Sequence, residues 1–171
     1  GANQNPNKWI IAASAILCIA IDWLTKMWAR QALLPGQNSE FIPGVLSLLL
    51  TWNTGAAFSL GRDHSMTMTA VACLVTGVVV LFIVQRHKAL CSNLERVGLG
   101  CLLGGAVGNL IDRFFYGRVT DFLNFAFISF PVFNVADVCI DVGIGLILIA
   151  LLKDQKQQTN QISDISGTER S

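Results

Sequence analysis

The sequence predicts an all-α membrane protein with four transmembrane helices, a small extracytoplasmic β-element and an interfacial loop. Of its 171 residues, 53% are hydrophobic and only 13% are charged, whereas a soluble domain carries about 25% charged residues. Four apolar segments approach the roughly 20 residues that a helix needs to cross a bilayer. They cover residues 9–28, 66–84, 97–111 and 132–152. We therefore expect lipid to surround most of the chain.

The four segments differ in their polar content. The first carries Asp22 and Lys26, the second has no charge, and the fourth contains Asp137 and Asp141. The third is short and must borrow flanking residues to span. The first is too long for the core of a signal peptide and has no small-residue cleavage pattern after it, so we interpret it as a retained membrane helix.

One membrane domain is expected from residue 9 to residue 152. The polar segment 1–8 precedes it and begins with Gly and Ala in place of an initiator Met, which we interpret as a remnant of cloning. Residues 153–171 should form a disordered cytoplasmic tail, because the chain from about residue 155 is rich in Gln, Ser, Thr and Asn.

Two connections on the outer side are expected to carry structure of their own. Residues 41–52 are apolar, contain Pro43 and Gly44, and are too short to span, so a β-element or an interfacial segment fits them. Residues 114–131 are rich in aromatic side chains, which favour the boundary between membrane and water. Part of this second connection should rest at that boundary.

Both termini are expected in the cytoplasm, because four spans return the chain to its starting side. Basic residues flank that side at Lys8, within residues 85–96, and at Lys153 and Lys156, as the positive-inside rule requires. The bias is weak, since the opposite side also carries lysine and arginine.

Composition excludes several classes of function. A net charge of +1 offers no basic surface for nucleic acid. The histidines, His64 and His87, lie outside the apolar segments, so a histidine-ligated zinc site in the membrane is not expected. The five cysteines form no CxxC pair, and we interpret them as packing residues. No nucleotide or phosphate motif is present, and we expect no cofactor.

Polar and ionisable residues gather near the outer ends of the predicted spans. Such residues are costly in a bilayer and are candidates for function. Spacings of three and four place several of them on shared helix faces. They are Asp22, Lys26, Asn53, Asn109, Asp112, Arg113, Asp121, Asn134 and Asp137, with Asp141 on the same face as the last two.

A pair of carboxylates fits this set better than other catalytic groups do. A Ser–His–Asp arrangement lacks its histidine, no serine is placed beside Lys26, and the cysteines lack a base. Two neighbouring carboxyls share one proton, so the ionised group can activate water while the protonated group polarises a carbonyl. Asp121, on a loop, and Asp137, at a helix start, come from separate segments and could form such a pair.

Five stretches, in order, are similar to lipoprotein signal peptidases (signal peptidase II), and the resemblance covers roughly residues 9–152. They are Asp22-Trp23-Leu24-Thr25-Lys26, Asn53-Thr54-Gly55-Ala56-Ala57-Phe58, Gly104-Gly105-Ala106-Val107-Gly108-Asn109-Leu110-Ile111-Asp112-Arg113, Val119-Thr120-Asp121-Phe122 and Phe133-Asn134-Val135-Ala136-Asp137.

The resemblance implies an aspartic peptidase of the bacterial inner membrane that removes signal peptides from prolipoproteins. It implies cleavage before the diacylglyceryl-modified cysteine, Asp121 and Asp137 as the catalytic pair, and inhibition by globomycin-like peptides. The substrate would meet the enzyme within membrane lipid, and a monomer is expected. The residues implied to bind or position substrate are Asp22, Lys26, Asn53, Gly55, Asn109, Arg113 and Asn134. Asp141 departs from the family pattern, in which that position is usually uncharged.

Structural interpretations stand beside these functional ones. Asp137 could cap its helix, Asp22 and Lys26 could form an intrahelical ion pair, and Arg113 with Asp112 could anchor a helix end at the headgroups. Gly104, Gly105 and Gly108 are typical of close helix packing.

An alternative function for the whole chain is a small transporter or proton channel, which would also gather acids inside a helix bundle. Transporters usually place such residues near the midplane and often have inverted repeats, whereas here the polar residues cluster toward one side of the membrane. A non-catalytic assembly factor that docks through the aromatic loop would leave the aspartates unexplained.

Overall fold

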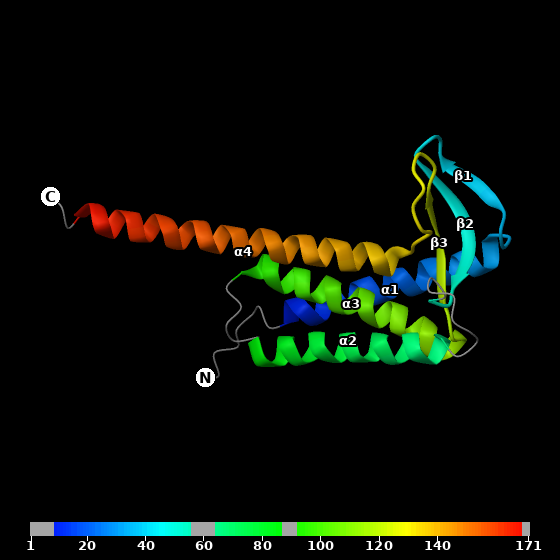
Figure 1. Cartoon of the computed structure of the whole chain (residues 1–171), viewed down its shortest axis with the longest axis horizontal. Coiled ribbons are helices and arrows are strands. Elements are labelled where there is room, and N and C mark those ends of the chain that lie inside the picture. Colours follow the sequence, from blue (N-terminus) through cyan, green and yellow to red (C-terminus); the bar gives the residue numbers. More distant parts are fainter. Residues whose placement is uncertain (1–8, 56–63, 87–91, 169–171) are drawn as a thin grey trace.

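The computed structural model describes residues 9–55, 64–86 and 92–168, which form four long helices and one three-stranded antiparallel sheet (Figure 1). The helices are α1 (Trp9–Ala32), α2 (His64–Arg86), α3 (Asn93–Tyr116) and α4 (Val135–Thr168), and the strands are β1 (Asn38–Ile42), β2 (Leu46–Asn53) and β3 (Val119–Phe125). All four helices are long and apolar enough to cross a membrane. The predicted fold class, with four spans and a small β-element, is confirmed.

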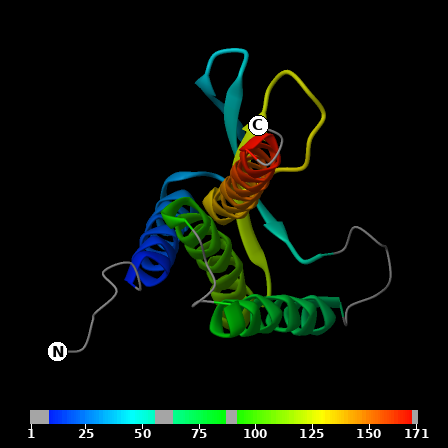
Figure 2. The ribbon, with the colours of Figure 1, turned by 90° about the vertical axis from the view of Figure 1, so that its left-hand side faces the viewer.

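Helix α3 is the centre of the bundle. It packs along α1 and α4 and, over a shorter stretch, against α2 (Figure 2). Its glycines allow this approach, as the sequence predicted. A methyl group on Gly104 would lie 2.7 Å from the carbonyl oxygen of Ala15 on α1, and one on Gly105 would collide with the carbonyl oxygen of Ala136 on α4. The three helices therefore meet backbone to backbone.

Replacing Gly105 by Val is expected to destabilise the bundle by about 1–3 kcal/mol, the usual cost of overpacking. The reason is that the added side chain would separate α3 from α4 at Ala136. Gly145→Val is the matched control, because a Cβ at this α4 glycine meets nothing within 4 Å. Thermal unfolding in detergent measures both. Equal losses in the two variants would contradict the packing argument.

Helix α3 is longer at both ends than the predicted span 97–111. It begins after Ser92, whose side chain accepts a hydrogen bond from the backbone N–H of Glu95 at 3.1 Å, and it ends at Gly117 in the left-handed conformation. Hydropathy underestimates this helix because its charged ends, including Arg96 and Asp112, are buried inside the protein.

Helix α4 also exceeds the prediction. The candidate membrane span within it is Val135–Lys156, but the helix continues to Thr168, whereas we expected disorder from about residue 155. The polar residues of this extension include good helix formers such as Lys and Gln, and no proline interrupts them. The polar segment 1–8 lies outside the described residues.

The sheet lies at one end of the bundle, opposite the start of α1 and the end of α4 (Figure 1). Strands β1 and β2 correspond to the predicted β-element, but β3 lies within the loop that we expected to be interfacial. Pairing with β2 forms it, with Thr51 opposite Asp121. Beyond β3, Phe127 and Phe130 are exposed, as expected of side chains at a membrane boundary. Predicting β3 required knowledge of a partner strand about 70 residues earlier.

Candidate active site

Asp121 is held at the middle of β3. Its neighbours fix the strand, because the backbone N–H of Thr120 donates to the Asp112 carboxylate at 2.8 Å. In addition, Leu123 exchanges two backbone hydrogen bonds with Phe133, just before α4, at 2.8 and 2.9 Å. Asp121 itself is only 2% exposed. The strand thus brings a buried carboxyl group next to the first turn of α4.

Asp137 lies in that first turn of α4 and takes part in a reciprocal cap. The Asn134 side-chain oxygen accepts from the Asp137 N–H at 3.1 Å, and the Asp137 carboxylate accepts from the Asn134 N–H at 3.1 Å. This is the capping-box arrangement with Asn and Asp in the two roles. The capping role considered from the sequence is therefore present, and it fixes one carboxylate oxygen of Asp137.

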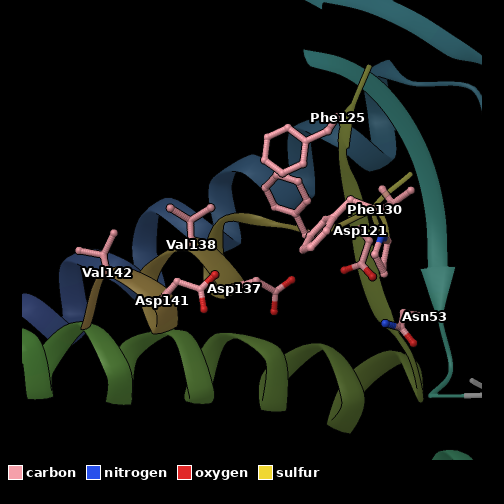
Figure 3. A pocket seen from close by; sticks show the side chains of 11 residues that line it. Asn53, Asp121, Phe125, Phe130, Asp137, Val138, Asp141 and Val142 are labelled. Carbon is pink, nitrogen blue, oxygen red and sulfur yellow. The ribbon is translucent and has the colours of Figure 1, made fainter. Parts of the chain in front are cut away.

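One asparagine joins the two acids. The Asn134 amide donates to Asp121 Oδ1 at 2.7 Å and is also 3.1 Å from Asn109 Oδ1. Asn109 in turn donates its amide to Asp137 Oδ1 at 2.9 Å. Asp121 and Asp137 line one cavity of about 400 Å³ and point toward one another across it (Figure 3). The structure therefore brings together the two carboxyl groups that the sequence paired.

The rest of this cavity is mostly apolar. Phe125, Phe130 and Phe133 line one part of it, and Val138 and Val142 of α4 line another. An apolar wall lowers the local dielectric and disfavours charge on nearby groups. The cavity can therefore accept a hydrophobic segment beside two acids.

The pKa of Asp121 is raised to about 6, and burial is the main cause. The negative charge of Asp137 also raises this pKa, whereas the hydrogen bond from Asn134 lowers it. A carboxyl group with this pKa holds a proton below about pH 6, where an ordinary aspartate has lost it. The site therefore holds one carboxyl group, that of Asp121, whose protonated form is favoured at a higher pH than in an ordinary aspartate.

Asp22 and Lys26 form a buried ion pair behind the two acids. Their side chains are 2% and 1% exposed, and Lys26 Nζ lies 2.8 Å from Asp22 Oδ2. Lys26 also donates to Asn109 Oδ1 at 3.0 Å, and Asp22 Oδ1 accepts from the Ala136 N–H at 2.9 Å. The pair therefore supports Asn109 and the start of α4 without lining the cavity.

Arg30 is a member of this network that sequence reasoning missed. Its guanidinium contacts Asp112 Oδ1 at 3.2 Å and donates to the Thr120 hydroxyl at 2.8 Å. The arginine fixes the strand next to Asp121. Its spacing of four residues from Lys26, which places both on one helix face, was the available signal.

The remaining predicted residues lie around the cavity in different ways. Asn53 lines it and accepts a hydrogen bond from the Gly55 N–H at 2.8 Å. Gly55 has φ +77°, and a side chain there would collide with Met68; the rest of this motif, residues 56–58, lies outside the described part of the chain. Arg113 lines a neighbouring cavity between α2 and α3, together with Asn109.

Asp141 lies on α4 one turn beyond Asp137 and lines the same cavity. Within residues 9–55, 64–86 and 92–168, no three His, Cys, Asp or Glu side chains form a group that could hold a metal ion.

Comparisons with known proteins agree with this architecture. The sequence profile described as Signal peptidase (SPase) II matches residues 14–153. A lipoprotein signal peptidase of Gloeobacter violaceus is 44% identical over 155 residues, covering 90% of this chain and 86% of the relative. One of Streptococcus agalactiae is 36% identical, covering 86% of this chain and 95% of the relative.

A solved structure has the same fold. It is described as a bacterial membrane enzyme determined by the in meso method at 1.9 Å resolution, and it is 30% identical with a TM-score of 0.75. The match covers 84% of this chain and 93% of that one. The chain therefore belongs to the signal peptidase II family and is a multi-pass peptidase of a bacterial membrane.

Proposed function

We propose that the chain is an aspartyl endopeptidase that removes signal peptides from prolipoproteins by cutting before the diacylglyceryl-modified cysteine. The observation that carries this proposal is the pair of carboxyl groups, Asp121 and Asp137, joined through Asn134 in the wall of a mostly apolar cavity. Membership of the signal peptidase II family supports the choice of substrate.

In this proposal the two acids divide the chemistry of hydrolysis. Asp121, with its raised pKa, holds the proton and transfers it to the carbonyl oxygen of the scissile bond as water attacks. Asp137 is ionised and takes a proton from the attacking water, whose oxygen bonds to the carbonyl carbon. The C–N bond then breaks as the departing amine receives a proton from Asp137, and Asp121 recovers its own when the new carboxyl group forms.

The surrounding residues act on substrate or on the acids. Asn53 lines the cavity, where its oxygen accepts from the Gly55 N–H and its side chain also hydrogen-bonds Asp121, whose pKa it lowers. Asn109 and Asn134 set the orientation of the carboxyl groups. Asp22 and Lys26 are positioning residues, because they are buried behind Asn109 and do not line the cavity.

We also infer the orientation in the membrane. The acids and the sheet lie at one end of the bundle, and the beginning of α1 and the end of α4 lie at the other (Figure 1). Lys153 and Lys156 flank that other end, so the positive-inside rule assigns it to the cytoplasm. The active site would then open at the extracytoplasmic boundary, where the end of a membrane-spanning signal peptide emerges.

Cleavage of a synthetic lipidated precursor tests the proposal. The protein purified in detergent should release a product whose new N-terminus is the diacylglyceryl-modified cysteine, identified by mass spectrometry. The same precursor without its lipid is the control and should react much more slowly. Cleavage at another bond, or none, would refute the assignment.

Activity is expected to fall as pH rises through about 6, because Asp121 then loses the proton that it must donate. The sign follows from the raised pKa: the productive form, with Asp121 protonated, is populated below that pH and depleted above it. Well above pH 6 the rate should drop about tenfold per pH unit. A pH–rate profile of kcat/KM for the lipidated precursor measures this.

The variant Asn134→Ser tests whether the pH dependence of cleavage comes from Asp121. Serine can still cap α4, but its shorter side chain cannot keep the amide contact with Asp121. That contact lowers the pKa of Asp121, so its loss should move the fall in activity to higher pH. A profile that is flat between pH 5 and 8, or one that the variant shifts downward, would contradict the assignment of the proton to Asp121.

A further inference from the structure

Asp141 is the one acid in the cavity that the proposed chemistry does not use. It lies four residues after Asp137, so both carboxyl groups project from the same side of α4 into the cavity (Figure 3). Asp141 is exposed, and among the described residues no hydrogen bond or ion pair reaches its carboxylate.

Its setting makes this unpaired state costly. Asp141 lies within the candidate membrane span Val135–Lys156, and its neighbours on the cavity wall include Val138 and Val142. An ionisable group in such surroundings is costly to keep and usually faces a partner or a pathway. The cavity that holds Asp121 and Asp137 is the pathway available to it, so the missing partner should come from whatever fills the cavity.

We propose that Asp141 is a specificity-determining residue that accepts a hydrogen bond from a donor side chain of the signal peptide, two to four residues before the scissile bond. This rests on the proposed function. Four helical residues rise about 6 Å. That distance corresponds to about two residues of an extended substrate, at roughly 3.3 Å each, or to about four of a helical one.

The chemistry of the substrate favours its peptide over its lipid as the source of that hydrogen bond. Asp141 is deeper in the span than Asp137, and the part of a precursor that lies deeper in the membrane is the signal peptide. An ionised carboxylate only accepts hydrogen bonds. The diacylglyceryl group has ester oxygens, which accept but do not donate, whereas threonine, serine, asparagine and glutamine side chains donate.

The test compares lipidated precursors that differ by one threonine or valine, which are similar in shape but differ by a hydroxyl group. The pair is made at each of the three positions, two, three and four residues before the scissile bond. At one of them the wild-type enzyme should prefer threonine by about tenfold in kcat/KM, as one hydrogen bond to a charged group allows. In Asp141→Leu the ratio should fall to within about twofold of unity.

Two further variants separate recognition from folding. Asp141→Asn retains a side-chain oxygen that accepts hydrogen bonds and should keep part of the preference. Asp154→Leu removes another acid of α4 that does not line the cavity and should keep all of it. Thermal unfolding in detergent establishes that each variant is folded.

Equal threonine-to-valine ratios in the wild type and Asp141→Leu at all three positions would overturn the inference. So would a change in Asp141→Leu that disappears when the ester-linked lipid is replaced by an ether-linked one, because the carboxyl group would then contact lipid. If the wild-type protein cleaved no precursor, the proposed function itself would fail, which is a different result from cleavage without selectivity.

Discussion

Replacing either Asp121 or Asp137 by Asn is expected to reduce cleavage of a lipidated precursor by at least about 10³-fold. Each acid has a separate task in proton transfer, and an amide can neither supply nor take up the proton. The two effects should not add in the double variant, because acids that act as one unit fail together. Single-turnover rates with excess purified enzyme measure the loss directly.

Both variants should remain folded, although for different reasons. Asp121 accepts from the Asn134 amide at 2.7 Å and also hydrogen-bonds the Asn53 side chain, and an asparagine oxygen can still accept from Asn134. Asp137 accepts from Asn109 and from the Asn134 N–H with different oxygens, so Asn would lose one of these bonds and weaken the cap.

Asp154→Asn, on the same helix and away from the cavity, is the control for loss of an acid on α4. Undiminished cleavage by either active-site variant would refute the carboxylate pair. If Asp137→Asn lost cleavage because it unfolded, Asp121→Asn, the milder of the two substitutions, would decide whether the acids are catalytic.

Much of the fold could be predicted because a membrane constrains it strongly. A span must be long and apolar, so the four helices were identifiable from sequence alone. The ends of α3 and α4 were not, because hydropathy measures preference for lipid and not helix formation. Arg96 and Asp112 interrupt the apolar pattern but are buried within a continuous helix.

The site could be predicted in part for a similar reason. Acids near the ends of spans are rare enough to attract attention, so Asp121 and Asp137 were named before the strand that positions one of them. The sequence did not reveal which side chains from distant parts of the chain contact one another. Asn134 joins two acids by one amide and one backbone N–H, and the resemblance suggested only that it lies nearby.

Strand β3 illustrates the remaining limit. Its aromatic residues indicated a membrane boundary, and that interpretation fits the exposed Phe127 beyond the strand. The strand itself depends on β2, which ends at Asn53 and pairs with Val119 there. Local sequence holds little information about such a pairing, because β-propensity largely reflects the neighbours a strand acquires.

Lys26→Met is the second substitution expected to have a large effect, and the effect is on stability. The ammonium group is almost fully buried, lies 2.8 Å from Asp22 Oδ2, donates to Asn109 Oδ1 at 3.0 Å, and forms a longer ion pair with Asp112 at 3.8 Å. Removing it takes away the cation paired with Asp22 and leaves Arg30 as the ion-pair partner of Asp112 among the described residues. Breaking a buried ion pair in this way costs about 3–5 kcal/mol.

A double variant distinguishes unpaired charge from lost packing. Lys26→Met combined with Asp22→Asn removes the uncompensated carboxylate but keeps a side-chain oxygen that can accept from the Ala136 N–H. It should therefore be more stable than Lys26→Met alone, although it has lost more of the ion pair. Lys153→Met removes an exposed lysine of α4 and is the control. Thermal unfolding in detergent, followed by circular dichroism, ranks the variants.

Stability and activity should separate in the double variant, and this follows from the order of the contacts. Lys26 holds Asn109 Oδ1, and the amide nitrogen of the same side chain holds Asp137. Without the lysine, Asn109 Oδ1 keeps the Asn134 amide as a donor but loses its charged one, so the amide group of Asn109 is held less firmly against the carboxylate of Asp137. The double variant should thus regain much of the fold and little of the cleavage. If Lys26→Met were as stable as the wild type, or if the double variant recovered both properties together, the buried pair would not have the positioning role that its geometry indicates.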